Sequence, residues 1–236
     1  MDWTPYDAVL FDLDGVITPT AELHMRAWAE MFNAFLDSHG VEEPYTDDDY
    51  FAYVDGKPRY DGVRSFLQSR GIDLPEGDPS DPPEAETVCG LGNRKNDVFN
   101  AVLARDGIAA YPGSLRLLEV LAERGIKVAV VSSSKNAPTV LEAAGLADRF
   151  PVVVDGSVAA DLALPGKPRP ETFLHAAEEV GVPAGRAVVV EDAVSGVAAG
   201  RAGNFGLVVG VDRGAGEQTL LDSGADVVVA DLEELA

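Results

Sequence analysis

The amino-acid sequence predicts an open, doubly wound α/β sheet that is interrupted after its first strand by a helical insertion. Short valine-rich runs recur along the chain without polar residues between them, as in parallel strands that are buried on both faces. Helical patterns separate most of these runs, and this alternation is typical of a parallel, Rossmann-like sheet. Residues 18–107 break the alternation, because they contain helical patterns but no strand-like run.

The strand-like runs can be placed individually. They cover residues 8–11, 127–131, 152–154, 187–190, 207–209 and 226–229. Helices are expected between them at 114–124, 138–145 and 170–181, and each of these patterns ends at or next to a glycine. A further helix is expected to begin near Ser195, after the fourth run.

The insertion has helical patterns of its own. Apolar residues recur every four positions between 21 and 38 and predict a long helix there. Shorter helices are expected at 61–68 and 97–105, whereas the proline-rich stretch 75–83 can only be a loop. The chain is therefore expected to form a core domain of residues 1–17 and 108–236 and an α-helical cap domain of residues 18–107.

The composition excludes several classes of partner. The 236 residues include 18 basic and 40 acidic side chains, which gives a net charge of −22. Such a surface does not suit nucleic-acid phosphates or anionic lipid. The single cysteine allows no intramolecular disulfide, the N-terminus has no signal-peptide pattern, and no apolar run is long enough to span a bilayer. We therefore expect a soluble, cytoplasmic monomer with no nucleic-acid or membrane partner.

Polar residues gather where the predicted strands end, which is where open α/β sheets bind ligands. They are Asp12 and Asp14, the run Ser132 to Asn136, Lys167, and Glu191 with Asp192. Four carboxylates at one edge repel one another unless a cation lies among them, and ligands that are all oxygen suit Mg²⁺. Lys167 supplies a second positive charge, and the serine hydroxyls can bind a phosphate.

Together these groups describe phosphoryl transfer through an aspartyl phosphate. Each group alone has a more common structural explanation. Pairs such as Asp12 and Asp14 often occur in turns, Ser132 or Glu191 could cap a helix, and Lys167 could be an exposed lysine. Their occurrence in order, each at a strand end, favours the chemical interpretation.

Four segments resemble the motifs of the haloacid dehalogenase superfamily, and in detail those of its β-phosphoglucomutase family. They are Phe11-Asp12-Leu13-Asp14-Gly15-Val16, Val131-Ser132-Ser133-Ser134-Lys135-Asn136, Gly166-Lys167-Pro168 and Val190-Glu191-Asp192-Ala193-Val194-Ser195-Gly196. The resemblance covers nearly the whole chain. It implies a Mg²⁺-dependent enzyme that interconverts β-glucose 1-phosphate and glucose 6-phosphate through glucose 1,6-bisphosphate, and a helical insertion that acts as a mobile cap.

The resemblance also implies a role for each matching residue of the core. Asp12 would be the nucleophile that becomes phosphorylated, and Asp14 the general acid and base. Mg²⁺ would be held by Asp12, the backbone carbonyl of Asp14, Glu191 and Asp192. Ser132 and Lys167 would hold the phosphoryl group that is transferred. The other phosphate of the sugar would be bound by the run Ser133, Ser134, Lys135 and Asn136.

The cap is expected to supply further substrate groups, because a mutase must close over its phosphoaspartate to exclude water. The segment from Val54 to Arg59 resembles the family's substrate loop, in which Arg59 would clamp a phosphate with two hydrogen bonds. The other cap residues that match family positions are Gly56, Lys57, Lys95 and His24, the last two near Asp14. Taken alone, Arg59 and Lys95 are more often solvated cations, and a histidine such as His24 more often lies on a helix surface.

Two positions depart from the family pattern: Pro19, where relatives often have an acidic residue, and Asp55, where mutases can carry a lysine. They leave the identity of the sugar phosphate open. A sugar-phosphate phosphatase of the same superfamily is the main alternative, since it would share the core residues. A phosphoaspartate receiver is a remote one, because receivers are about half this length and have no cap.

Overall fold

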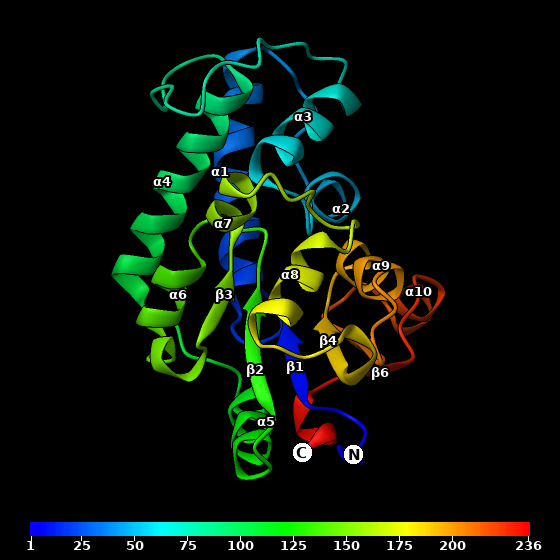
Figure 1. The fold of residues 1–236 in the computed structure, drawn as a ribbon. Helices are drawn as coiled ribbons and strands as arrows, with labels where there is room; N and C mark the ends of the chain where they lie inside the picture. Colours follow the sequence, from blue (N-terminus) through cyan, green and yellow to red (C-terminus); the bar gives the residue numbers. More distant parts are fainter. The chain divides into compact units, whose positions relative to one another are not determined.

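The computed structural model describes all 236 residues, which divide into two compact units (Figure 1). The first unit consists of Met1–Thr20 and Ile108–Ala236, and the second of Ala21–Gly107. The chain therefore passes from the first unit to the second after Thr20, whereas the sequence pattern places the end of the first core segment at residue 17. That the second unit acts as a cap stays a prediction.

A six-stranded sheet, parallel throughout, forms the centre of the first unit, with the order β3-β2-β1-β4-β5-β6. The strands are β1 (Ala8–Phe11), β2 (Lys127–Val131), β3 (Val152–Val154), β4 (Ala187–Glu191), β5 (Leu207–Val211) and β6 (Val227–Val229). All six predicted strands are confirmed. The order reverses between β1 and β4, which is the point where sheets of this kind bind ligands.

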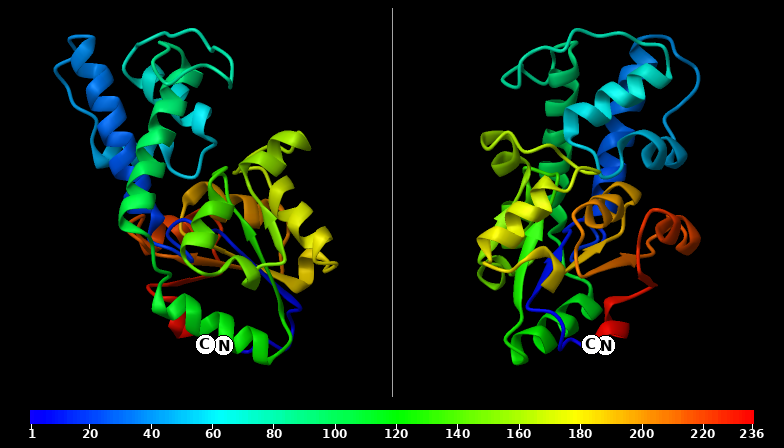
Figure 2. Two further views of the ribbon diagram at one scale, coloured as in Figure 1. Left: turned by 90° about the vertical axis from the view of Figure 1, so that its left-hand side faces the viewer. Right: turned by 45° about the vertical axis from the view of Figure 1, so that its right-hand side comes forward.

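The helices of the first unit are α5 (Pro112–Glu123), α6 (Ala137–Ala143), α7 (Gly156–Asp161), α8 (Glu171–Glu179), α9 (Val194–Ala202) and α10 (Glu217–Asp222). Helix α8 packs against β1, β2 and β3, and α9 against β4 and β5 (Figures 1 and 2). The expected helices at 114–124, 138–145 and 170–181 are confirmed. The sequence pattern missed α7 and α10, because six residues are too few to show a helical period.

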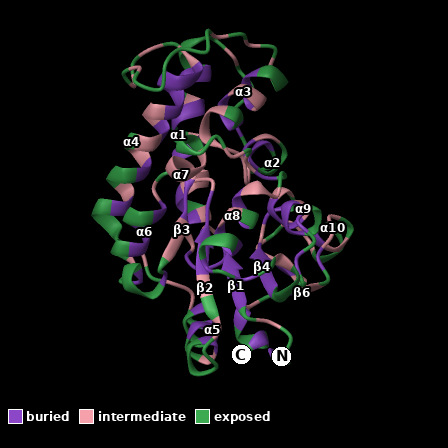
Figure 3. Ribbon diagram, viewed as in Figure 1, coloured by how far each residue is buried: buried purple, intermediate pink, exposed green.

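Strands β1 and β4 at the centre of this sheet are buried throughout, and the helices that cover the sheet are buried in part (Figure 3). Leu10 of β1 and Val131 of β2 belong to one cluster with Phe173 and Ala176 of α8. The indole Nε1 of Trp3 donates a hydrogen bond to the carbonyl of Leu235 at 3.1 Å, so the two ends of the chain lie side by side (Figure 2). None of the helices has the length and apolar composition needed to cross a membrane.

The second unit is helical. Its elements are α1 (Thr20–Ser38), α2 (Asp47–Asp49), a π-helical turn (Tyr50–Val54), α3 (Arg59–Ser69) and α4 (Val88–Asp106). Aromatic residues form much of its core, and the ring of Phe32 lies 5.3 Å from that of Trp28 and 4.2 Å from that of Phe66. Residues 75–83 contain no helix or strand, as their prolines predict.

Helix α4 is longer than the helix expected at 97–105. It begins at Val88, where the Thr87 hydroxyl caps it by accepting a hydrogen bond from the backbone N–H of Gly90 at 2.9 Å. Gly90 and Gly92 weaken the helical pattern in the sequence. Contacts with neighbouring segments explain why these positions are glycine. A Cβ on Gly90 would lie 2.3 Å from the carbonyl oxygen of Ala85. A Cβ on Gly92 would likewise lie 2.7 Å from the ring of Tyr60.

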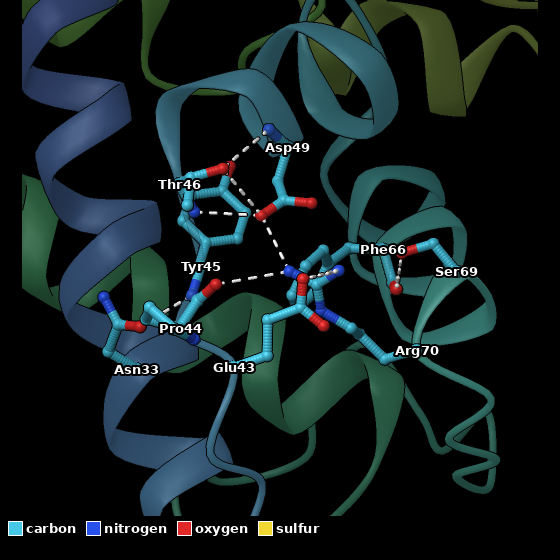
Figure 4. Close-up of polar contacts among 9 residues, drawn as sticks. All are labelled: Asn33, Glu43, Pro44, Tyr45, Thr46, Asp49, Phe66, Ser69 and Arg70. Atoms are coloured by element: carbon cyan, nitrogen blue, oxygen red, sulfur yellow. Dashed lines mark hydrogen bonds and ion pairs between the residues drawn. The ribbon is translucent and has the colours of Figure 1, made fainter.

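The acidic run 47–49 contains one buried residue with a structural role. Asp49 is only 7% exposed, and it forms a reciprocal cap with Thr46 at the start of α2. Its Oδ2 atom lies 2.8 Å from Nη2 of Arg70, at the end of α3 (Figure 4). The guanidinium of Arg70 also lies 5.1 Å from the ring centre of Phe66. This ion pair therefore joins α2 to α3.

Replacing Arg70 by methionine leaves the buried carboxylate of Asp49 without its cationic partner, while Thr46 still donates to it. We expect the free energy of unfolding to fall by about 3 kcal/mol, since breaking a buried ion pair strands a charge. Arg64→Met on the same helix is the matched control, because Arg64 pairs with Asp61 and Glu76 at the surface. That substitution should cost less than about 1 kcal/mol. Urea denaturation measures both, and equal losses would contradict the role of the Arg70 pair.

Candidate active site

The carboxyl ends of three neighbouring strands bring together the candidate residues of the core. Asp12 directly follows β1, Ser132 follows β2, and Glu191 is the last residue of β4. Strand β1 lies between β2 and β4, with Phe11 paired to Val130 on one side and to Val190 on the other. The three side chains therefore start from adjacent points on one edge of the sheet.

A buried lysine joins two of the carboxylates. The Nζ atom of Lys167 lies 2.5 Å from Oδ1 of Asp12 and 2.5 Å from Oε1 of Glu191. It also donates a hydrogen bond to the carbonyl of Val131 at 3.0 Å, and its side chain is only 3% exposed. Burial alone would lower the pKa of Lys167, but the two carboxylates outweigh this effect and raise the pKa above its ordinary value. The amine is therefore positively charged.

One lysine does not balance the charge at this edge. Burial raises the pKa of Asp12 well above its ordinary value, and the carboxylates of Glu191 and Asp14 raise it further, while Lys167 acts in the opposite direction. Four carboxyl groups, those of Asp12, Asp14, Glu191 and Asp192, thus stand at this edge with one lysine, and further positive charge would stabilise their ionised forms.

Three carboxylates could hold such a charge. One oxygen each from Asp12, Glu191 and Asp192 lie within 4.8 Å of one another. Asp12 and Glu191 are buried, and Asp192 is partly buried. These donors are all oxygen, and Mg²⁺ prefers such ligands in proteins. The residues present therefore fit a Mg²⁺ ion.

Two glycines make room for these carboxylates. A Cβ on Gly15 would lie 1.8 Å from Oδ2 of Asp192, and Gly15 also has a positive φ of 82°. A Cβ on Gly196 would lie 1.8 Å from Oε1 of Glu191. Both glycines occur in the motifs quoted above, but only the folded chain gives the reason for them.

The side chain of Asp14 has different partners and is not one of the three clustered carboxylates. Its Oδ1 atom accepts a hydrogen bond from the hydroxyl of Thr20, and its Oδ2 atom accepts one from Ser132 at 3.4 Å. The hydroxyl of Thr20 also lies 3.0 Å from that of Thr18, and both threonines are buried. The sequence reasoning missed Thr20, because a threonine beside a proline carries no distinctive signal.

Arg213 is a second residue that the sequence reasoning missed. Its Nε atom donates a hydrogen bond to the carbonyl of Gly15 at 2.9 Å, and its guanidinium lies 4.0 Å from the ring centre of Tyr111. It therefore fixes the turn that follows Asp14. Arg213 stands two residues after Val211, the last residue of β5, so a search of the fifth strand end could have found it.

The turn after β2 contains the remaining candidates of the core, namely Ser133, Ser134, Lys135 and Asn136. The backbone N–H of Ser134 donates to the hydroxyl of Ser132 at 3.1 Å. The backbone N–H of Asn136 donates in the same way to the hydroxyl of Ser134 at 3.1 Å. The serines thus order this turn, and helix α6 begins directly after it.

In the second unit, Arg59 is the first residue of α3 and is held by α4. Its Nη2 atom donates to Oδ1 of Asn96 at 2.8 Å, and its Nη1 atom donates to Oδ1 of Asn93 at 3.4 Å. Gly56 and Lys57 stand in the turn before α3, and the amine of Lys57 donates to the hydroxyl of Ser65 at 2.9 Å. Arg59 is therefore an oriented side chain and not a free surface cation.

His24 and Lys95, the other two candidates of this unit, lie side by side. The Nζ atom of Lys95 contacts Nδ1 of His24 and lies 5.0 Å from the ring centre of Trp28. The ring of His24 stacks on Phe99 at 4.3 Å, and Lys95 is only 3% exposed. Lys95 is therefore buried and not solvated, and His24 is partly buried against Phe99.

Comparison with known proteins gives these residues a family. The family model described as "Hydrolase: haloacid dehalogenase-like hydrolase" matches residues 6–204. The chain is 52% identical over 240 residues to a β-phosphoglucomutase of Mycobacterium tuberculosis, with 97% of this chain and 90% of that protein covered. The chain belongs to the β-phosphoglucomutase family of the haloacid dehalogenase superfamily.

Other members of the family agree with this assignment. A β-phosphoglucomutase of Bacillus subtilis is 34% identical over 229 residues, which cover 97% of this chain and 91% of that protein. The crystal structure of β-phosphoglucomutase from Clostridium difficile superposes with a TM-score of 0.77 at 27% identity, covering 98% of this chain and 93% of that one. The predicted fold class and family are confirmed, and so is the prediction of an enzyme from a phosphosugar mutase family.

If the clustered carboxylates bind Mg²⁺, the ion will stabilise the folded chain. We expect saturating Mg²⁺ to contribute about 2 kcal/mol and to raise the melting temperature by about 4–8 °C. Asp192→Asn should reduce this rise, because it removes one of the three ligands. Asp148→Asn, at an exposed aspartate, is the matched control and should leave the rise unchanged. Calorimetry with and without Mg²⁺ measures this, and identical melting curves for the unsubstituted protein would refute the site.

Proposed function

We propose that the protein is a β-phosphoglucomutase that interconverts β-D-glucose 1-phosphate and β-D-glucose 6-phosphate through an aspartyl-phosphate enzyme and glucose 1,6-bisphosphate. The observation that carries the proposal is the 52% identity, over nearly the full length of both chains, to the β-phosphoglucomutase of M. tuberculosis. The buried group of Asp12, Lys167 and Glu191 supports it, since this reaction needs a carboxylate nucleophile beside positive charge.

In the first half-reaction, Asp12 carries the phosphoryl group. The C6 hydroxyl of β-glucose 1-phosphate attacks the phosphorus, and Asp14 takes the proton from that hydroxyl. The bond between phosphorus and the carboxylate oxygen of Asp12 breaks, which yields glucose 1,6-bisphosphate and a free Asp12 carboxylate. The hydrogen bonds that Thr20 and Ser132 donate to Asp14 support its role as the base, because they fix its orientation.

In the second half-reaction, the bisphosphate presents its other phosphate to the same residues. Asp12 attacks the phosphorus at C1, and the bond between that phosphorus and the C1 oxygen breaks. Asp14 returns its proton to the C1 oxygen, so glucose 6-phosphate leaves and the phosphorylated Asp12 is restored. Over the two steps no phosphate is consumed, which balances an isomerisation.

The remaining core residues bind and orient the reacting groups. Lys167 and Ser132 would hold the phosphoryl group in transfer, Lys167 as a charge that the buried carboxylates keep in place. The Mg²⁺ ligands in this proposal are Asp12, the backbone carbonyl of Asp14, Glu191 and Asp192. When bound, the ion supplies positive charge beside the transferring phosphoryl group.

The second phosphate of the sugar would be recognised by other residues. In the first unit these are Ser133, Ser134, Lys135 and Asn136. In the second unit, which we propose to act as the cap, they are Arg59 with Gly56 and Lys57, together with Lys95 and His24. The fixed orientation of the Arg59 guanidinium supports its role as a phosphate clamp. A cytoplasmic location and a monomeric state are part of the same proposal.

A sugar-phosphate phosphatase is the second candidate, because the matching family model is named for hydrolases. Its reaction would use the same Asp12, Asp14, Lys167 and Asp192, with water in place of the sugar hydroxyl. Exclusion of water by a cap is what separates the two reactions.

The two functions differ in their products. We expect the protein, given β-glucose 1-phosphate, a trace of glucose 1,6-bisphosphate and Mg²⁺, to form glucose 6-phosphate with little inorganic phosphate. Asp12→Asn should lower the rate at least about a thousandfold, because it removes the nucleophile. Asp148→Asn should leave the rate unchanged. Inorganic phosphate as the main product would reject the mutase in favour of the phosphatase.

A further inference from the structure

The proline-rich stretch 75–83 has no role in the reaction described so far, yet it is fastened to helix α4 at both ends. The backbone N–H of Val88 donates to the carbonyl of Pro75 at 2.9 Å. At the other end, Nε of Arg94 donates to the carbonyl of Pro83 at 2.8 Å. The stretch therefore has a defined position against the helix.

Asn93 of α4 lies between these attachments and uses every hydrogen-bonding position of its amide. Its Nδ2 atom donates to the carbonyl of Pro79 at 3.1 Å and to that of Asp81 at 2.9 Å. Its Oδ1 atom accepts from Nη1 of Arg59 at 3.4 Å and from the hydroxyl of Tyr60 at 3.0 Å. The amide nitrogen faces two carbonyl acceptors and the amide oxygen faces two donors. Only one orientation of the amide therefore satisfies all four partners.

The fit of Arg59 against α4 depends on a glycine. A Cβ on Gly92 would lie 2.7 Å from the ring of Tyr60 and 3.1 Å from Cδ of Arg59. A side chain at position 92 would displace the ring of Tyr60 and crowd the stem of the arginine. One turn further along, Asn96 accepts the second hydrogen bond of the guanidinium at 2.8 Å.

The partners of Arg59 are neutral, in contrast to those of the other arginines nearby. Arg64, on the same helix, pairs with Asp61 and Glu76, and Arg70, at the end of that helix, pairs with Asp49. Arg59 has two asparagine amides instead and forms no ion pair. Burial lowers the pKa of Arg59, Tyr60 and the carboxylate of Asp97 act in the opposite direction, and no carboxylate forms an ion pair with the guanidinium. An oriented but unneutralised guanidinium is suited to bind an anion from outside the protein.

We propose that Asn93, itself fixed by the carbonyls of Pro79 and Asp81, is a positioning residue that holds Arg59 ready for the second phosphate of the sugar substrate. The proline-rich loop is then part of the substrate-binding apparatus, because it fixes the amide that fixes the arginine. This inference rests on the phosphate-binding role proposed above for Arg59.

A double-mutant cycle tests the proposal, with KM for β-glucose 1-phosphate as the readout. Arg59→Ala should raise KM about ten- to a hundredfold, as expected for losing hydrogen bonds to a charged group. Asn93→Ala should raise KM about three- to tenfold with a smaller effect on kcat. In the double variant, KM should be no higher than in Arg59→Ala alone, because Asn93 acts through the arginine.

Two further variants separate positioning from loss of stability. Arg70→Met breaks the buried pair with Asp49 at the opposite end of α3 from Arg59 and touches neither Asn93 nor the proline-rich loop. Its melting temperature should fall as that of Asn93→Ala does, while its KM stays unchanged. Asn93→Gln keeps the amide but displaces it, and it replaces Asn93→Ala in the test if that variant does not fold. Its KM should rise by a smaller factor than the one expected for Asn93→Ala.

The possible failures can be told apart. If Arg59→Ala leaves KM unchanged, the proposed role of Arg59 is wrong, and the role of Asn93 is wrong with it. If Arg59→Ala raises KM but Asn93→Ala does not, or if the two effects multiply in the double variant, only the positioning role is wrong. An equal rise in KM for Arg70→Met would attribute the effect to a loosened second unit and would also overturn the proposal.

Discussion

The ion pairs of Lys167 with Asp12 and Glu191 are the interaction on which the site depends. The order of the sheet places β1 beside β4, so two carboxylates reach the same buried edge, where their repulsion is strong. A buried lysine compensates for part of this charge, and removing one partner would leave the others uncompensated. This crowding explains why Gly15 and Gly196 have no side chain, since one would collide with Asp192 or Glu191. It also makes the site suitable for a cation.

Most of the fold and the core of the site could be predicted from the sequence, because both depend on local patterns. Buried parallel strands are recognised by their valine runs, and the candidate ligand-binding residues follow these runs directly. Local patterns do not predict the role of a residue when that role depends on contacts with distant parts of the chain. Gly90 and Gly92 look like helix breakers until their neighbours are known, and Asp49 looks solvated until Arg70 is placed against it. Thr20, which donates to Asp14, has no sequence signal of its own.

The arginines of the second unit differ in the charge of their partners, in a chain with a net charge of −22. Arg70 is paired with a carboxylate and joins two helices, which is a structural use of its charge. Arg59 is oriented by asparagine amides, which direct the guanidinium without cancelling its charge. The choice between Asp or Glu and Asn as the partner thus separates arginines that stabilise the fold from the one that we propose to bind substrate. Net charge does not reveal this difference, because it depends on which side chains meet.

The identity of the phosphorylated residue tests the proposed chemistry most directly. The protein is incubated with glucose 1,6-bisphosphate and Mg²⁺, quenched in acid and digested, and the peptides are analysed by mass spectrometry. We expect one phosphoryl group on the peptide that contains Asp12, at Asp12 itself, and none in Asp12→Asn. A phosphoryl group on any other residue, or none on the unsubstituted protein while it forms glucose 6-phosphate, would contradict a mechanism through Asp12.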